Sequence, residues 1–180
     1  MATDGSALGM RQRVGVCAAL LAWALLGGPG AGALALEWGA INPGQTTMDA
    51  VRARYGEPTQ TSTQKEEQRD SVRWVYEGAQ APIGMERMVV DFGLLTPGGY
   101  RPQIVRSVLL HPKPGAFDRA VVVQGWGVPS AVGSQSGAPA FLYEEGLFVS
   151  FDQEGWAVSS MIFTPPQKMP PGEAEPESSR

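Results

Sequence analysis

The sequence predicts an α+β protein made of two tandem units, each a short helix packed on a three-stranded antiparallel meander. Three observations predict this class. Similar segments recur in the two halves of the chain, each copy opens with a stretch that ends in Gly-x-Pro, and alternating apolar residues typical of half-buried strands follow.

The two halves of the chain share short blocks of similar residues in the same order. Block 55–58 matches block 126–129 at an offset of 71 positions, and the offset falls to 67, 59 and 53 for the three blocks that follow. An offset that only shrinks indicates the same unit with shorter loops, because insertions fall between elements rather than inside them. We therefore predict one unit at 36–112 and a second, shorter one at 113–166.

The first unit opens with a predicted helix over 46–55. Thr46 or Thr47 supplies an N-cap, and Asp49 places negative charge in the first turn, where it suits the helix dipole. Gly56 is a natural stop, since glycine readily adopts the left-handed conformation beyond the last turn. The apolar residues of this segment recur at helical spacing, so the helix must pack on a partner.

The corresponding segment of the second unit, 117–124, is ambiguous. Its position after the repeated opening favours a helix, but the run Val121-Val122-Val123 favours a strand. Both assignments remain open at this point.

Three strands are predicted after each helix, joined by short connections that favour antiparallel pairing. Segment 59–71, between the first helix and its strands, is predicted to be a polar loop. The residues predicted to point inward alternate along the strands. They are Val72, Trp74, Tyr76, Met88, Val90, Phe92, Val108 and Leu110 in the first unit, and Phe141, Tyr143, Leu147, Val149, Phe151, Val158, Met161 and Phe163 in the second.

Both ends of the chain are predicted to lie outside these units. Residues 1–35 have the layout of a Sec-type signal peptide, with basic residues before the uncharged run 14–26 and small residues before a cleavage point after Ala35. Cys17 lies near the start of the apolar run, which is the wrong place for the acylated cysteine of a lipoprotein. We expect a periplasmic or secreted protein with no transmembrane segment after leader removal. Residues 167–180, rich in proline and glutamate, are predicted to be a disordered acidic tail.

Composition excludes several function classes. The 180 residues include 14 Lys and Arg against 18 Asp and Glu, a net charge of −4, so a general nucleic-acid binder is disfavoured. One cysteine and one histidine exclude a disulfide scaffold and a Cys/His zinc site. No nucleophile motif accompanies the serines. We therefore predict no catalytic residues, no cofactor and no metal.

A family resemblance enters through the opening motif. Segment 41–58, followed by Trp74-Val75-Tyr76 and by 88–92, resembles the SmpA/OmlA (BamE-like) family of small bacterial envelope proteins. The tandem arrangement also resembles the β-lactamase inhibitory protein superfamily. The first resemblance implies an envelope component linked to outer-membrane protein assembly, and the second implies a two-lobed concave binding face.

The predicted function is that of an exported, non-enzymatic protein-binding or scaffolding module of the bacterial envelope. Trp38 and Trp156 are the candidate partner-binding residues, because exposed aromatic side chains often anchor partners. The expected partner is another protein, an envelope component, and a peripheral membrane association is left open. Two alternatives are a secreted enzyme inhibitor with a concave face and a hydrolase with an unrecognised site.

Overall fold

The computed structural model describes residues 36–66 and 69–166. The chain divides into two units, Met1–Ala31 and Gly32–Arg180, and every described residue belongs to the second. The predicted leader at 1–35, with Cys17, and the predicted acidic tail at 167–180 lie outside the described residues. No helix within the described ranges has the length and apolar character of a membrane-spanning segment.

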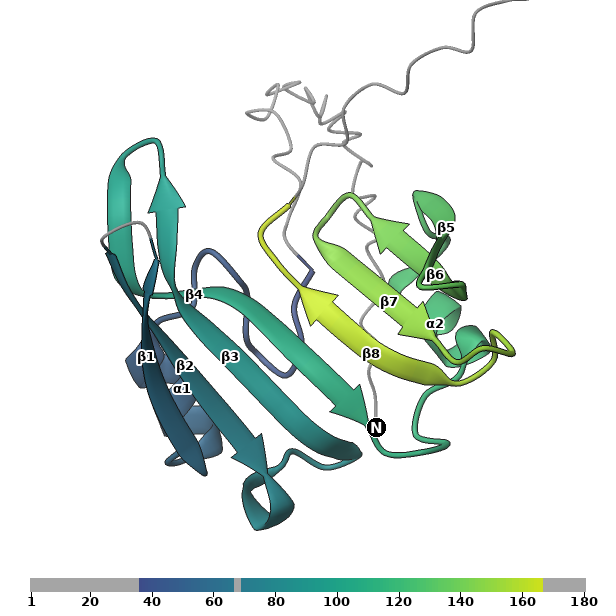
Figure 1. Cartoon of the computed structure of the whole chain (residues 1–180), viewed down its shortest axis with the longest axis horizontal. Helices are drawn as coiled ribbons and strands as arrows, with labels where there is room; N and C mark the ends of the chain where they lie inside the picture. The colour runs from purple at the N-terminus through teal and green to yellow at the C-terminus, as the bar shows by residue number, and fades with distance from the viewer. Residues whose placement is uncertain (1–35, 67–68, 167–180) are drawn as a thin grey trace, which may run out of the picture. The chain divides into compact units, whose positions relative to one another are not determined.

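Within the described residues, eight strands form one antiparallel sheet, and two short helices lie on one face of it (Figure 1). The strand order is β1-β2-β3-β4-β8-β7-β6-β5, so β1 and β5 are the two edges. The first half of the sheet contains β1 (Gln60–Glu66), β2 (Arg69–Glu77), β3 (Met85–Thr96) and β4 (Gly99–Pro112). The second contains β5 (Ala131–Gln135), β6 (Ala138–Tyr143), β7 (Leu147–Phe151) and β8 (Val158–Phe163). A single 3-10 turn, Gly78–Gln80, follows β2.

Helix α1 (Met48–Tyr55) has the caps that its sequence predicts. The Thr47 hydroxyl accepts a hydrogen bond from the Ala50 N–H at 3.3 Å. Gly56 ends the helix at a φ of 79° while its N–H donates to the Arg52 carbonyl. A residue with a side chain would be strained at this φ, so the glycine marks the helix end.

Helix α2 (Arg119–Trp126) resolves the ambiguity of segment 117–124 in favour of a helix, shifted by two residues. Asp118 caps it by accepting the Val121 N–H at 2.8 Å, and Gly127 ends it at a φ of 81°. The middle valine, Val122, is fully buried in the core, while Val121 remains 40% exposed. The cap, the stop and one buried contact therefore outweigh the β-preference of the valine run.

The two halves of the sheet meet where β4 pairs with β8, which we call the seam. Only three residue pairs join these strands: Val108–Phe163, Leu109–Ile162 and Leu110–Met161. Further along β4 the neighbour is the segment before α1, since the Gly44 N–H donates to the Val105 carbonyl at 2.8 Å. The Val105 N–H in turn donates to the Thr46 carbonyl at 2.9 Å.

The core lies between the sheet and the two helices. Every residue predicted to point inward is buried, except Val72, which is half-buried and packs against the core. Edge-to-face ring pairs fill each half, Trp74 with Phe92 at 4.8 Å and Phe141 with Phe151 at 4.8 Å between ring centroids. This geometry adds to the stabilisation that the buried area of the rings provides.

The predicted fold class is wrong. Four strands follow each helix where the sequence analysis expected three, and all eight join one sheet instead of forming two tandem helix-plus-meander units. Strand β1 lies in the segment 59–71 that was expected to be a polar loop, and β5 was not expected. Both are edge strands whose side chains are mostly exposed, so neither has the alternating pattern that predicts a half-buried strand.

Candidate functional site

Among residues 36–66 and 69–166, no helix covers one face of the sheet, and both helices lie behind the sheet in the view of Figure 1. Trp74 and Tyr76 point toward the helices, so Val75 between them points to the helix-free face. Strand pairing continues from Val75 as a row of apolar side chains on six adjacent strands. This apolar row consists of Val75, Val89, Leu109, Ile162, Phe148 and Leu142.

Exposure along the apolar row is uneven. Val75 and Val89, in the first half of the sheet, are only 5% and 6% exposed. The other four residues, which extend from β4 to β6, are half-buried. The apolar surface that a ligand could reach therefore lies on the seam and on the second half of the sheet.

Charged pairs flank the apolar row in the first half. Arg73 and Asp91 form a two-bond ion pair, with Nε–Oδ1 at 2.7 Å and Nη2–Oδ2 at 3.0 Å, and the Ser107 hydroxyl also donates to Asp91 at 3.3 Å. On the other side of the row, Arg87 Nε lies 3.8 Å from Glu77 Oε2 in a second ion pair. A fork-shaped pair of this kind has a fixed geometry, so this part of the face is rigid and already internally paired.

An apolar hollow of about 320 Å³ adjoins the row at the turn between β6 and β7. Phe148, Ile162 and Leu142 of the apolar row contribute to its wall. The complete lining is Leu142, Tyr143, Gly146, Leu147, Phe148, Ile162 and Thr164.

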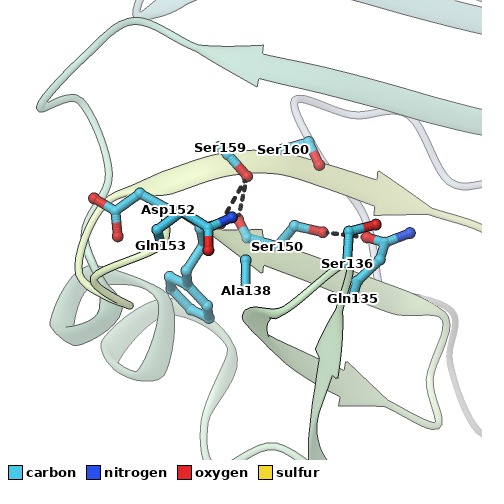
Figure 2. A pocket seen from close by; sticks show the side chains of 9 residues that line it. Gln135, Ser136, Ala138, Ser150, Asp152, Gln153, Ser159 and Ser160 are labelled. Atoms are coloured by element: carbon cyan, nitrogen blue, oxygen red, sulfur yellow. Dashed lines mark hydrogen bonds between the residues drawn. The ribbon is translucent and has the colours of Figure 1, made fainter.

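A second, polar hollow of about 460 Å³ lies where β5, β6, β7 and β8 come together (Figure 2). The Ser150 hydroxyl donates to Gln135 Oε1 at 2.8 Å, and the Ser159 hydroxyl donates to the carbonyls of Ser150 and Phe151 at 3.1 and 3.2 Å. Seven of the nine residues that line it have polar side chains, while apolar atoms make up most of the surface that they expose. The lining is Gln135, Ser136, Ala138, Ser150, Phe151, Asp152, Gln153, Ser159 and Ser160.

The chemistry available in the polar hollow is hydrogen bonding. Asp152 accepts backbone N–H bonds from Trp156 at 2.9 Å and Ala157 at 3.3 Å, and these bonds hold the pKa of its carboxyl below the usual value. A carboxylate held in this way is a weak proton acceptor. The partner of the Ser150 hydroxyl is an amide, which does not act as a base. In this arrangement the Ser150 and Ser159 hydroxyls donate to an amide oxygen and to backbone carbonyls.

The two tryptophans singled out from the sequence lie against different helices. Trp38 is half-buried and stacks on Tyr55 of α1, with ring centroids 6.1 Å apart and an interplanar angle of 9°. Trp156 lies in the turn between β7 and β8, where its carbonyl accepts the Arg119 N–H of α2 at 3.0 Å and its side chain is 68% exposed. The structure does not bring the two side chains into one site.

Sequence reasoning missed the apolar row, although a signal for it was present. Neighbouring apolar pairs such as Leu109-Leu110, Phe141-Leu142 and Met161-Ile162 occur where strict alternation would put a polar residue. Such pairs are typical of strands with apolar surface on both faces. Among residues 36–66 and 69–166 there is no group of three side chains suited to hold a metal ion.

Comparisons with known proteins give a single structural likeness to report. No family model matches the chain, and no curated protein matches it. A crystal structure of a DUF4309 family protein (YjgB) from Bacillus subtilis subsp. subtilis str. 168 matches with a TM-score of 0.45 and 10% sequence identity. The match covers 70% of this chain and 82% of that chain.

The resemblance to the SmpA/OmlA (BamE-like) family and to the tandem β-lactamase inhibitory protein superfamily is wrong. The helix with three strands that carried it does not exist as a unit, because each helix is followed by four strands of one shared sheet. No model of either family matches the chain. The expected link to outer-membrane protein assembly depended on this resemblance and has lost that support.

Proposed function

We propose that this chain is an exported, non-enzymatic protein-binding module that holds another protein on the helix-free face of its sheet. The observation that carries the proposal is the apolar row, whose part from Leu109 to Leu142 is half-buried and covered by no helix of the described part of the chain. Contiguous apolar surface with a polar surround is typical of protein interaction sites.

The residues around the apolar hollow indicate what kind of protein surface would fit there. The apolar hollow beside Phe148 and Ile162 is large enough to take an aliphatic or aromatic side chain, and the other hollow on this half is lined mostly by residues with uncharged polar side chains. A partner that fits presents an apolar anchor residue surrounded by uncharged polar groups. Buried anchors of this kind supply most of the binding free energy in protein interfaces.

Export is supported by the leader pattern at 1–35, with cleavage after Ala35. An exported chain without catalytic or metal-binding motifs is consistent with a binding role.

Site-specific crosslinking in the producing cells tests the proposal. Phe148 is replaced by a photoreactive phenylalanine analogue, and the crosslinked product is compared with and without Ile162→Glu, which places a charge in the hollow. Ser62→Glu is the matched control, since Ser62 lies opposite Arg73 on the same face of the sheet but at the β1 edge. Circular dichroism confirms that each variant is folded.

We expect one discrete crosslinked protein, reduced at least tenfold by Ile162→Glu and unchanged by Ser62→Glu. A crosslink that survives Ile162→Glu, or no crosslink from position 148 on irradiation, would contradict the proposal.

A further inference from the structure

Strand β5 is an edge whose outer side has no neighbour within the described residues. It pairs only with β6, from Ala131–Leu142 to Gln135–Ala138. An open edge presents backbone N–H and C=O groups that can pair with another strand.

Pro139 determines which backbone groups of β5 point outward. Antiparallel pairs alternate between pairs that exchange two hydrogen bonds and pairs that exchange none. Pro139 has no N–H, so the pair Ser134–Pro139 belongs to the second kind, and so does Val132–Phe141 two residues away. The N–H and C=O groups of Val132 and Ser134 therefore face away from β6.

The side chains of this edge do not protect it in the usual ways. The sequence Ala-Val-Gly-Ser-Gln of β5 contains no charge and no proline, whereas the opposite edge, β1, carries the charged Lys65. Val132 is 63% exposed, and Val128, just before the strand, is 84% exposed. Charges and prolines are the common devices that keep edge strands from pairing, and β5 has neither.

We propose that β5 is a self-association edge to which β5 of a second copy adds in antiparallel orientation. Val132 and Ser134 lie symmetrically on either side of Gly133, so a two-fold axis at Gly133 pairs each Val132 with Ser134 of the other copy. The central Gly133 pair has no side chains to collide at the close approach of a non-hydrogen-bonded pair.

A second copy fits this edge for reasons of charge as well as geometry. The chain carries a net charge of −4, so most surfaces of two copies repel each other. The uncharged β5 strand lets two copies meet without opposing like charges, and the pairing covers the exposed Val132. The contact is short, so the dimer is weak and reversible rather than obligate.

The symmetry gives the dimer a functional property. A two-fold axis perpendicular to the sheet places both helix-free faces on the same side of one continuous sheet. Two apolar rows would then be available together to a multivalent partner, which strengthens binding without new contacts.

Sedimentation analysis of the protein isolated from its producing cells, over a wide range of concentrations, tests the proposal. Ser134→Pro removes an outward N–H without removing a β5–β6 hydrogen bond, and Val132→Lys places like charges at the contact. Thr63→Lys is the matched control, because Thr63 opposite Val72 lies on the helix side of the other edge, as Val132 does on β5.

We expect a reversible monomer–dimer equilibrium that both β5 variants weaken at least tenfold and that Thr63→Lys leaves unchanged. Amide hydrogen exchange at Val132 and Ser134 should slow as the protein concentration rises. A monomer at every concentration, or a dimer that neither β5 variant weakens, would overturn the proposal. The crosslink from position 148 is independent of this result, so failure here is distinguishable from failure of the proposed function.

Discussion

Two buried tyrosines tie the ends of the helices to the sheet. The Tyr76 hydroxyl donates to the Gly56 carbonyl at 3.2 Å, and the Tyr143 hydroxyl donates to the Gly127 carbonyl at 3.1 Å. Each bond satisfies a carbonyl just beyond a helix C-terminus, where the helix itself supplies no partner. These residues therefore fix each helix against the strand beneath it.

The pKa of Tyr76 gives a prediction about alkaline stability. Burial, and to a smaller extent the charge of Glu57, raises this pKa from 10.0 to about 12. Between about pH 10 and pH 12 the folded protein keeps the phenol proton that the unfolded chain loses. The contribution of Tyr76 to stability is therefore fully present below about pH 10 and is lost as the pH rises toward 12. The same direction holds for Tyr143, whose pKa is also raised by burial.

We expect the free energy of unfolding, measured with urea, to decline between about pH 10 and pH 12, by on the order of 2 kcal/mol from Tyr76 alone. Tyr76→Phe should be less stable at neutral pH by about 1 kcal/mol, because the hydrogen bond to Gly56 is lost, but its decline with pH should be shallower. A variant that declines as steeply as the natural chain would refute this role.

The helix caps differ in strength. Asp118 accepts the Val121 N–H at 2.8 Å and adds negative charge at the start of α2, whereas Thr47 accepts the Ala50 N–H at 3.3 Å. Asp118→Ala should therefore lower the free energy of unfolding by about 1 kcal/mol, and Thr47→Ala by less. Urea denaturation of the two variants makes the comparison, and a larger loss for Thr47→Ala would show that the ranking is incorrect.

The two tryptophans should separate binding from stability. Trp38→Ala removes a half-buried ring that stacks on Tyr55 and packs on the core, so we expect a loss of about 2 kcal/mol in stability. Trp156→Ala should change stability by less than about 0.5 kcal/mol, because the ring is 68% exposed. We expect Trp156→Ala to reduce capture of the partner at least tenfold. A variant that captures as much partner as the natural chain would show that Trp156 lies outside the binding site.

At the scale of single elements, the hairpin between β6 and β7 depends on one glycine. Gly146 has a φ of 103°, and a Cβ at this position would clash with the Thr164 carbonyl oxygen. Its own carbonyl accepts the Thr164 N–H at 2.8 Å, so the turn is held directly against the end of β8. Neither the methyl group of an alanine at position 146 nor the Thr164 backbone can move away without breaking this hydrogen bond.

We expect Gly146→Ala to lower the free energy of unfolding by on the order of 3–5 kcal/mol. Gly115→Ala is the matched control, because Gly115 has a φ of 75° but no atom within 4 Å of an added Cβ, so only backbone strain of about 1–2 kcal/mol applies. Thermal or urea denaturation measures both. Equal losses of unfolding free energy for the two variants would mean that the structure adjusts around Thr164 and that the clash does not destabilise the protein.

The elements that sequence reasoning found and missed differ in one physical respect. The first helix and six strands were predicted because each buries one apolar side, which leaves a period of 3.6 or 2 in the sequence, whereas segment 117–124 has no such period and stayed open between helix and strand. Strands β1 and β5 bury almost no side chains, and their backbone pairing with β2 and β6 leaves no such period. The apolar row was missed for a related reason, since its members come from six strands and become neighbours only through pairing.

At the scale of the whole molecule, the contacts at the seam determine whether the two halves of the sheet unfold cooperatively. Three residue pairs join β4 to β8, and Leu110, which faces the core there, is fully buried. The core side chains on both sides of the seam belong to one continuous cluster. We therefore expect the two halves to unfold together.

Leu110→Ala tests this cooperation. It should lower the free energy of unfolding by about 2–5 kcal/mol, and native-state hydrogen exchange should show the same loss for amides of β2 and of β7. Thr63→Ala, at the exposed β1 edge, is the control and should change neither. Loss of protection confined to one half would show that the halves are independently stable.

The sequence by itself determined much of the local structure: the first helix with its cap and stop, the six alternating strands and the residues that face the core. These properties depend on neighbours within a few positions, so periodicity and capping chemistry reveal them. Only the tertiary structure decided that four strands follow each helix, that all eight form one sheet, and that an apolar row crosses its helix-free face. These properties depend on backbone pairing between distant segments, which places few constraints on the side chains of an exposed edge.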